Sequence, residues 1–152
     1  MITSTSSSQV KHVVNLQKKA KLRKEEKQFV VEGVKMVSEA PADRLVKVYV
    51  SETFKADNEE FLERMNYDSI GKDVLEIVTD NVFMRMADTQ TPQGIMAVVR
   101  MSDTDLEGIL SDKRNPLLLI IENLQDPGNL GTIVRMAEGA GVTGIIMSSN
   151  TV

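Results

Sequence analysis

LLLIIENLQDPGNLGTIVR, residues 117–135, predicts a strand that runs through a polar turn into a helix. Residues 117–121 form a continuous apolar run, which is typical of a parallel strand covered on both faces. Residues 126–128, Asp-Pro-Gly, then end the strand and redirect the chain. We expect Asn129 to cap the following helix, with Arg135 about 1.7 helical turns further along.

A second strand is predicted directly after this helix. Ala140-Gly141 is a helix-stop signal, and residues 144–147 are again apolar. Parallel strands of α/β proteins end at one edge of the sheet, where such proteins place their chemistry. Residues 117–147 are therefore expected to form one strand-helix-strand unit with a polar cluster at that edge.

The residues before this unit predict a compact α/β sandwich that ends near Arg100. Its expected elements are one helix or a pair of short helices up to about residue 28, strands at 29–31, 46–50, 75–78 and 95–99, and helices at 34–40, 58–65 and 81–87. An acidic stretch, residues 101–116, carries one short predicted helix at 106–110. We interpret that stretch as a linker.

Several residues between 123 and 141 resemble the first signature motif of the SpoU (TrmH-type) RNA ribose 2'-O-methyltransferases. The matching residues, in the order and spacing of the motif, are Asn123, Asp126, Pro127, Asn129, Gly131, Ile133, Arg135, Ala137 and Gly141. Residues 29–33 resemble the start of the family's N-terminal substrate-binding domain, and residues 91–99 resemble its closing loop and strand. Together these segments account for nearly the whole chain in the expected order.

The resemblance implies a domain organisation. Residues 1–100 would form an RNA substrate-binding domain, a small α/β sandwich similar to ribosomal proteins that hold kinked RNA. Residues 117–152 would begin a SPOUT (trefoil-knot) domain, whose remaining motifs and S-adenosylmethionine site lie beyond Val152. The chain is thus expected to be a fragment. The alternative, a natural short protein, would need another cover for its two-stranded sheet, since an isolated pair of strands is marginal.

The resemblance also assigns roles at the strand end. Arg135 matches an arginine proposed to bind the target phosphate and assist deprotonation of the ribose hydroxyl. Because free guanidinium stays protonated, we favour phosphate binding and electrostatic stabilisation. Asn129 would hold the backbone or the ribose, and Glu122 and Asn123 would orient Arg135 or the substrate. From spacing alone, Asn129 is only a cap and Arg135 only an exposed helix residue.

Basic residues are concentrated near the N-terminus. Residues 1–40 hold eight basic and four acidic side chains, although the whole chain has a net charge of −4. The cations expected to contact RNA phosphates are Lys18, Lys19, Lys21, Arg23 and Lys24. The alternative is a solvated helix face.

Composition narrows the remaining classes. The sequence has no cysteine and one histidine, His12, so we expect no metal site. No apolar run has membrane-span length, and we expect a cytoplasmic protein. The expected partners are RNA, with rRNA favoured over tRNA, and a second copy in a homodimer of the whole protein. Two alternatives to a methyltransferase stay open, a non-catalytic RNA-binding module and another nucleotide-binding α/β protein.

Overall fold

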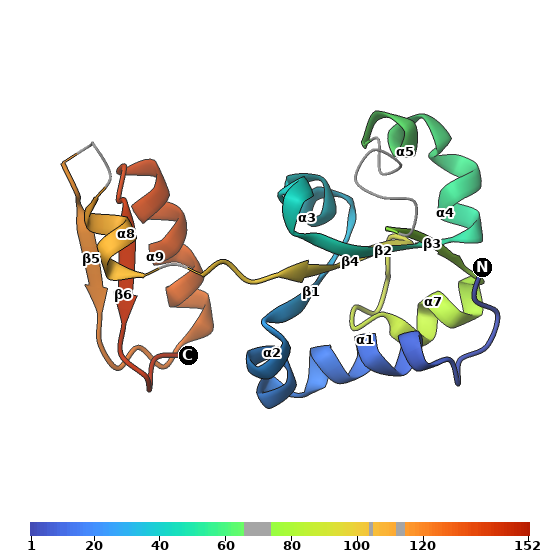
Figure 1. The fold of residues 1–152 in the computed structure, drawn as a ribbon, viewed down its shortest axis with the longest axis horizontal. Helices are drawn as coiled ribbons and strands as arrows, with labels where there is room; N and C mark the ends of the chain where they lie inside the picture. Colours follow the sequence, from blue (N-terminus) through green and yellow to red (C-terminus); the bar gives the residue numbers. More distant parts are fainter. Residues whose placement is uncertain (66–73, 104, 112–114) are drawn as a thin grey trace. The chain divides into compact units, whose positions relative to one another are not determined.

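The computed structural model describes residues 1–65, 74–103, 105–111 and 115–152. The chain divides into two compact units, Met1–Met101 and Ser102–Val152 (Figure 1). The boundary lies one residue beyond the predicted end of the first domain at residue 100. The short helix at 106–110, predicted in a linker, lies within the second unit.

The first unit is built on a mixed four-stranded sheet. Its strand order is β1-β4-β2-β3, with β4 antiparallel to both of its neighbours and β2 parallel to β3. The strands are β1 (Gln28–Glu32), β2 (Leu45–Ser51), β3 (Leu75–Val78) and β4 (Ile95–Arg100). All four were predicted within two residues at either end.

Helices cover both faces of this sheet (Figure 1). Helices α1 (Ser8–Lys18) and α7 (Asp80–Met86) lie on one face, and α3 (Val34–Glu39), α4 (Glu52–Asp57) and α5 (Glu59–Met65) lie on the other. Helix α2 (Ala20–Glu26) follows α1, and a 3-10 turn, Ala42–Arg44, precedes β2. The first helical stretch is therefore a pair of helices, and α4 was not predicted.

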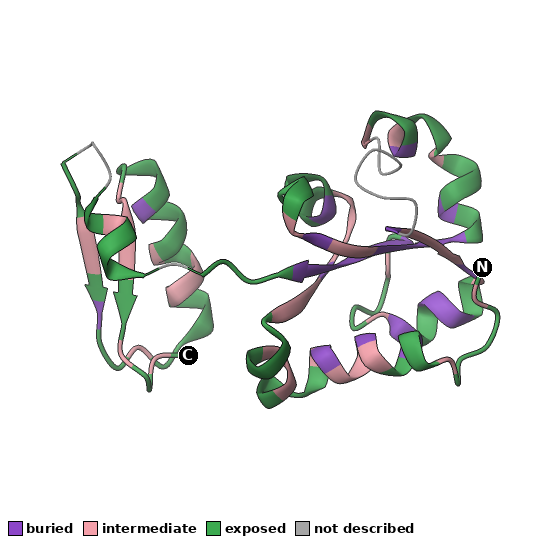
Figure 2. Cartoon of the chain, viewed as in Figure 1, coloured by how far each residue is buried: buried purple, intermediate pink, exposed green. Residues whose placement is uncertain are grey.

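The strand β4 supplies both halves of the core. Ile95, Ala97 and Val99 pack into one apolar cluster with α3 and α4, while Met96 and Val98 pack into the other with α1 and α7. Figure 2 shows β4 buried along nearly its whole length. This alternation follows from the two-residue period of a strand.

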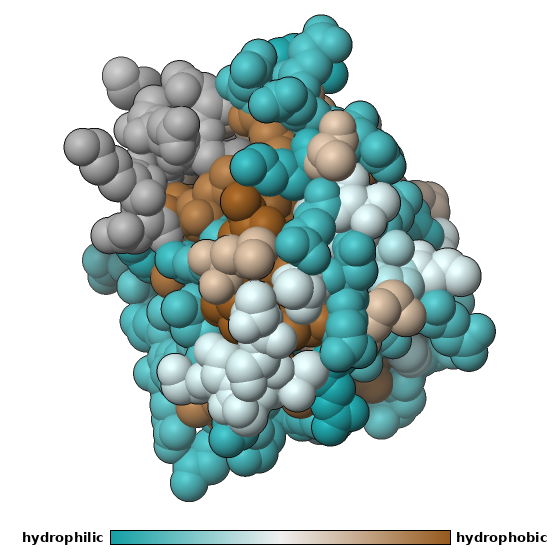
Figure 3. All heavy atoms as spheres, turned by 90° about the vertical axis from the view of Figure 1, so that its right-hand side faces the viewer, coloured by the Kyte–Doolittle hydropathy of each residue, from teal (hydrophilic) through white to brown (hydrophobic). Residues whose placement is uncertain are grey.

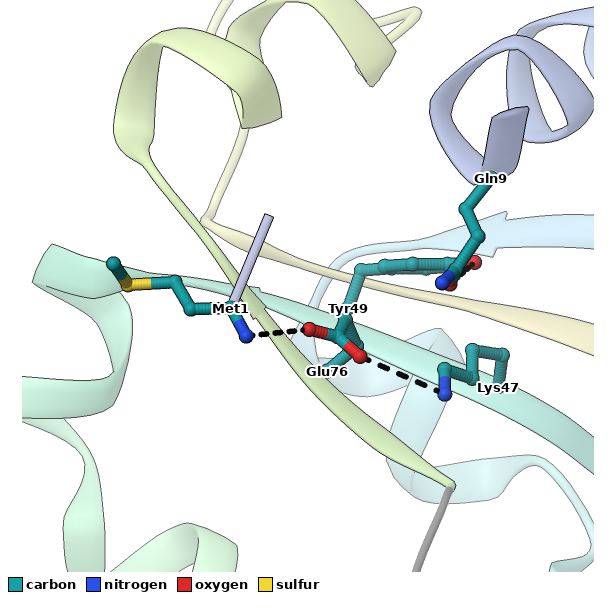
Figure 4. Close-up of polar contacts among 5 residues, drawn as sticks. All are labelled: Met1, Gln9, Lys47, Tyr49 and Glu76. Carbon is teal, nitrogen blue, oxygen red and sulfur yellow. Dashed lines mark hydrogen bonds and ion pairs between the residues drawn. The ribbon is translucent and has the colours of Figure 1, made fainter. Parts of the chain in front are cut away.

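A small polar cluster lies on the α1 face of the sheet (Figure 4). The Tyr49 hydroxyl donates to Oε1 of Gln9 at 3.1 Å. Nearby, the Glu76 carboxylate contacts the amino group of Met1 at 2.9 Å and Nζ of Lys47 at 3.7 Å. Burial, and to a smaller extent the charge of Glu76, raises the pKa of Tyr49 to about 12. These contacts join α1 and β3 to β2.

The second unit contains the expected strand-helix-strand motif. Strands β5 (Leu118–Ile121) and β6 (Gly144–Met147) are parallel, with α9 (Pro127–Gly139) between them and α8 (Leu106–Leu110) before them. The α/β fold class is confirmed in both units. The described residues do not cover β5 on both faces, since Ile120 is 72% exposed.

Within the described ranges, none of the helices is both long and apolar enough to span a bilayer. The same residues include no group of three or more His, Cys, Asp or Glu side chains placed to hold a metal ion.

Candidate functional site

The carboxyl edge of the β5–β6 sheet is polar, as the sequence predicted. Asn123 follows β5 and adopts a left-handed backbone conformation with φ 52°. Its amide N–H donates to Oγ of Ser148 at 3.0 Å, and its side-chain oxygen accepts from the amide of Asn150. Asparagine tolerates this conformation better than most residues. Asn123 is thus fixed in the turn by residues that follow β6.

Further hydrogen bonds join the two loops at this edge. Nε2 of Gln125 donates to the carbonyl of Asn150 at 2.7 Å, and the N–H of Val152 donates to the carbonyl of Leu124 at 3.0 Å. The sequence analysis did not single out Gln125, Ser148 or Asn150. A signal was present, because polar residues directly follow the second strand and parallel strands end at the same edge.

Asp126, and not Asn129, caps helix α9. Its Oδ1 accepts from the backbone N–H of Asn129 at 2.6 Å, and Pro127 occupies the first helical turn. The prediction of Asn129 as the cap is therefore wrong. The side chain of Asn129 is not used in capping and lies exposed in the first turn. Proline favours the first helical position, so Pro127 already marked Asp126 as the cap.

Arg135 lies on the exposed side of α9. Its Nη2 donates to Oγ1 of Thr132 at 3.3 Å, and Thr132 in turn donates to the carbonyl of Gly128 at 3.0 Å. Nη1 lies 3.5 Å from the place where a Cβ at position 131 would be, which is an ordinary van der Waals distance, so the guanidinium packs over Gly131. The guanidinium is thus directed back along the helix toward its N-terminus.

The recorded contacts do not bring all four candidates together. Among the described residues, no hydrogen bond or ion pair joins Arg135 to Glu122, Asn123 or Asn129, and the side chains of all four are exposed. The second unit therefore presents a permanent cation, Arg135, together with exposed side-chain amides and the backbone N–H groups at the start of α9. Such groups suit a phosphate and a ribose hydroxyl.

An exposed edge of this kind does not enclose a nucleoside cofactor. Sites for such ligands are concave and bury most of the ligand surface, whereas the polar side chains here face solvent and several are bonded to one another. The described residues of the second unit do not by themselves fit S-adenosylmethionine.

In the first unit, the two segments that carry the family resemblance lie next to each other. Oε1 of Gln93 accepts from the N–H of Val34 at 2.8 Å at the start of α3. The Glu32 carboxylate accepts from the N–H of Asp88 at 3.1 Å and from the hydroxyl of Thr89. Gly33, with φ 97°, turns the chain from the end of β1 into α3. A pocket of about 280 Å³ lies here, lined by Glu32, Gly33, Thr89, Thr91 and Gln93.

A second pocket lies at the carboxyl ends of β2 and β3. It measures about 320 Å³ and includes Ser51, Thr53 and Asp80 in its lining. Oδ2 of Asp80 accepts from the Thr53 hydroxyl at 2.8 Å. The Thr53 hydroxyl and then that of Ser51 hold the pKa of Asp80 below its usual value. Gly94 also lines this pocket and packs closely against Phe54, because a Cβ at position 94 would lie only 2.7 Å from Cβ of Phe54.

The outer side of β3 carries a more apolar hollow of about 320 Å³. Its lining includes Ile77, Ala56 and Met1, bordered by the charged residues of α4 and α5. Figure 3 views the molecule from this side and shows the brown apolar surface among teal polar side chains.

The basic side chains of α1 and α2 fall into two groups. Nη1 of Arg23 donates to the carbonyls of Leu16 and Gln17, both at 2.8 Å, so Arg23 caps the C-terminus of α1. Nζ of Lys21 lies 3.7 Å from Glu25. Lys18, Lys19 and Lys24 are exposed. These three side chains, like that of Lys11 on α1, are open to a ligand, whereas the guanidinium of Arg23 is occupied at the helix end.

Comparison with known proteins matches residues 7–97 to the family described as the MRM3-like substrate binding domain. Human mitochondrial rRNA methyltransferase 3 is 31% identical over 149 residues, which cover 92% of this chain and 33% of that protein. The 23S rRNA (guanosine-2'-O-)-methyltransferase RlmB of Haemophilus influenzae is 30% identical over 125 residues, covering 78% and 49%. The chain thus spans about a third to a half of these relatives.

Two solved structures are similar over almost the whole chain. An AdoMet-bound rRNA methyltransferase from Sinorhizobium meliloti has a TM-score of 0.77 and 25% identity, covering 99% of this chain and 55% of its own. A protein of the TrmH family from Porphyromonas gingivalis, described as an RNA methyltransferase, has a TM-score of 0.68 and 26% identity, covering 96% and 53%.

Proposed function

The chain belongs to the family of the MRM3-like substrate binding domain, and from this membership we propose that it is part of an RNA ribose 2'-O-methyltransferase. The resemblance to SpoU (TrmH-type) proteins is confirmed by the similar structures and relatives. The match of residues 7–97 is the observation that carries the proposal, because it identifies a substrate-binding domain that precedes a polar strand-helix-strand unit in the sequence.

In this proposal the first unit recognises RNA, and rRNA is the favoured substrate because the relatives are described as rRNA methyltransferases. S-adenosylmethionine would supply the methyl group, as the AdoMet-bound structure of a relative supports. The described residues do not form the site of this donor alone, so residues of the whole protein outside this chain would complete it.

We assign Arg135 to the RNA side of the reaction. A ribose hydroxyl is a poor nucleophile and must lose its proton as it attacks the methyl carbon. The guanidinium of Arg135 is exposed and carries a permanent positive charge, so it would hold a phosphate of the target nucleotide and stabilise the developing negative charge on the oxygen. Asn129, Glu122 and Asn123 would position the ribose and its neighbours.

Two further proposals concern the oligomeric state and the location of the whole protein. We propose a homodimer, which the exposed apolar side chains of β5 and β6 support, because Ile120, Ile146 and Met147 leave apolar surface uncovered in a single copy. The expectation of a cytoplasmic location is kept, although one relative is described as mitochondrial.

Methyl transfer by the whole native protein tests the proposal. Protein, rRNA and S-adenosylmethionine with a tritiated methyl group are incubated together, and radioactivity in the RNA is counted. We expect transfer with the wild type, a loss of at least about a hundredfold with Arg135→Ala, and partial retention with Arg135→Lys, which keeps the charge. Full activity of Arg135→Ala would overturn the assigned role. RNA binding without any methyl transfer would favour a non-catalytic RNA-binding module.

A further inference from the structure

A groove between α1 and α7 is lined by two cations, Lys11 and Arg85. The groove measures about 200 Å³ and is lined by Thr5, Val10, Lys11, Val14, Asn15 and Arg85. Helices α1 and α7 lie side by side on the same face of the sheet (Figure 1). Lys11 comes from α1 and Arg85 from α7, so two elements place one positive charge each at the same hollow.

The charge of this groove is not compensated locally. Among the residues that the structure describes, the side chains of Lys11 and Arg85 form no ion pair or hydrogen bond. Helix α1 contains no acidic residue. The single carboxylate of α7, Asp80, is bonded to Thr53. Elsewhere in this unit, cations such as Lys21 and Lys47 do lie beside carboxylates.

Beyond the groove, the same side of α1 carries a further cation, Lys18. Lys11, Asn15 and Lys18 are spaced by four and three residues and therefore share one side of the helix. The buried residues Val10, Val13 and Leu16 face the sheet. Figure 2 shows buried and exposed positions alternating along α1. The side chain of Asn15 adds an amide donor between the two lysines.

Together these features suit an extended chain of phosphates. We propose that the α1–α7 groove is a backbone-binding surface for RNA, with Lys11 and Arg85 on one phosphate and Lys18 on a neighbouring one. The inference rests on the proposed function, in that RNA is the ligand. It assigns contacts on the helical face of the first unit, separate from the pockets beside Gly33 and Gly94. Contacts to phosphates position a nucleic acid without reading its sequence.

The salt dependence of RNA binding tests this proposal. The 152-residue chain is titrated against a fluorescein-labelled RNA hairpin with a single-stranded loop, and fluorescence anisotropy is measured from about 50 to about 200 mM KCl. The variants are Lys11→Gln and Arg85→Gln, singly and combined. Lys55→Gln on the opposite face of the sheet is the matched control, because it removes one exposed cation from a helix of the same unit.

Each lost phosphate contact lowers the slope of log affinity against log salt by about 0.7 to 0.9. The wild type should therefore bind more tightly than the double variant at low salt. Because Lys11 and Arg85 share one phosphate, this difference in affinity should shrink about threefold from about 50 to about 200 mM KCl. Lys55→Gln should behave like the wild type. Conservative exchanges, Lys11→Arg with Arg85→Lys, should restore both affinity and slope. Circular dichroism and the thermal midpoint confirm that the variants are folded.

The two possible failures are distinguishable. If the double variant binds with the affinity and slope of the wild type, the groove is not an RNA surface, while the proposed methyltransferase function is untouched. If the wild-type chain binds no RNA at any salt concentration, the groove and RNA recognition by the first unit both fail. In either case the methyl-transfer assay on the whole protein decides the proposed function separately.

Discussion

Arg23 is a basic residue with a clear structural task. Nη1 of Arg23 donates to the carbonyls of Leu16 and Gln17 at the end of α1, whereas the nitrogen of a lysine lies one bond nearer the backbone and would not reach the same place. We expect Arg23→Lys to lower the free energy of unfolding by about 1–2 kcal/mol. Urea denaturation measures this change. Lys24→Gln, at an exposed neighbouring position, should stay within about 0.5 kcal/mol of the wild type.

That distinction bears on the predicted RNA contacts. If Arg23→Lys unfolds at the wild-type urea concentration, the capping bonds contribute nothing measurable and Arg23 is available for RNA. The lysine run alone did not separate Arg23 from Lys24, because a sequence does not show which cation turns back onto a helix end.

Tyr49 gives the protein a specific response to alkaline pH. Burial raises its pKa to about 12 in the folded protein, and its pKa in an unfolded chain is about 10. Folding therefore favours the neutral phenol, and this stabilisation is complete below about pH 10 and is lost as the pH rises toward 12. The wild type should lose stability through that range more steeply than Tyr49→Phe. Parallel curves for the two proteins would contradict the assignment.

At the scale of elements, Asp80 joins the first turns of α4 and α7 through Thr53. Hydrogen bonds from the hydroxyls of Thr53 and Ser51 lower the pKa of Asp80, so the charged form is favoured by folding. The resulting stability is present above the unfolded pKa of about 3.9 and is lost as the pH falls through the lower folded value. The difference in stability between wild type and Asp80→Asn should shrink below that pH in acid denaturation. A constant difference from neutral pH to acid would contradict this account.

The elements themselves were predictable to different degrees. The strand at 75–78 was predicted at both ends because Leu75, Ile77 and Val78 are apolar and the polar pair Thr79-Asp80 follows them. Helix α4 was missed because its six residues bury only Phe54, which is too little for a helical period. The start of α9 was misassigned because Asp126 and Asn129 are equally good caps by residue type, and only the position of Pro127 separates them.

The candidate site was predictable in composition and less so in geometry. The sequence placed Asn123, Asn129 and Arg135 at one strand end. It did not show that Arg135 turns toward Thr132, or that Asn150 holds Asn123 from the other loop. Those contacts depend on how two parallel strands align, and this register is set by tertiary packing.

At the scale of the whole molecule, the two units differ in how completely their sheets are covered. The first has helices on both faces of its sheet and a complete core, whereas the second leaves Ile120 and Met136 largely exposed. This contrast agrees with a chain that spans about a third to a half of its relatives. The run from 117 to 121 has the composition of a strand covered on both faces, and the described residues leave part of it exposed.

The central claim is that the whole protein methylates a ribose hydroxyl of RNA. The most direct test is to treat rRNA with the native protein and S-adenosylmethionine, digest the RNA to nucleosides, and identify the products by mass spectrometry. We predict a nucleoside that carries the new methyl group on its ribose, and its absence with Arg135→Ala. A methyl group on a base, or no methylated nucleoside from a protein that binds the RNA, would contradict the claim.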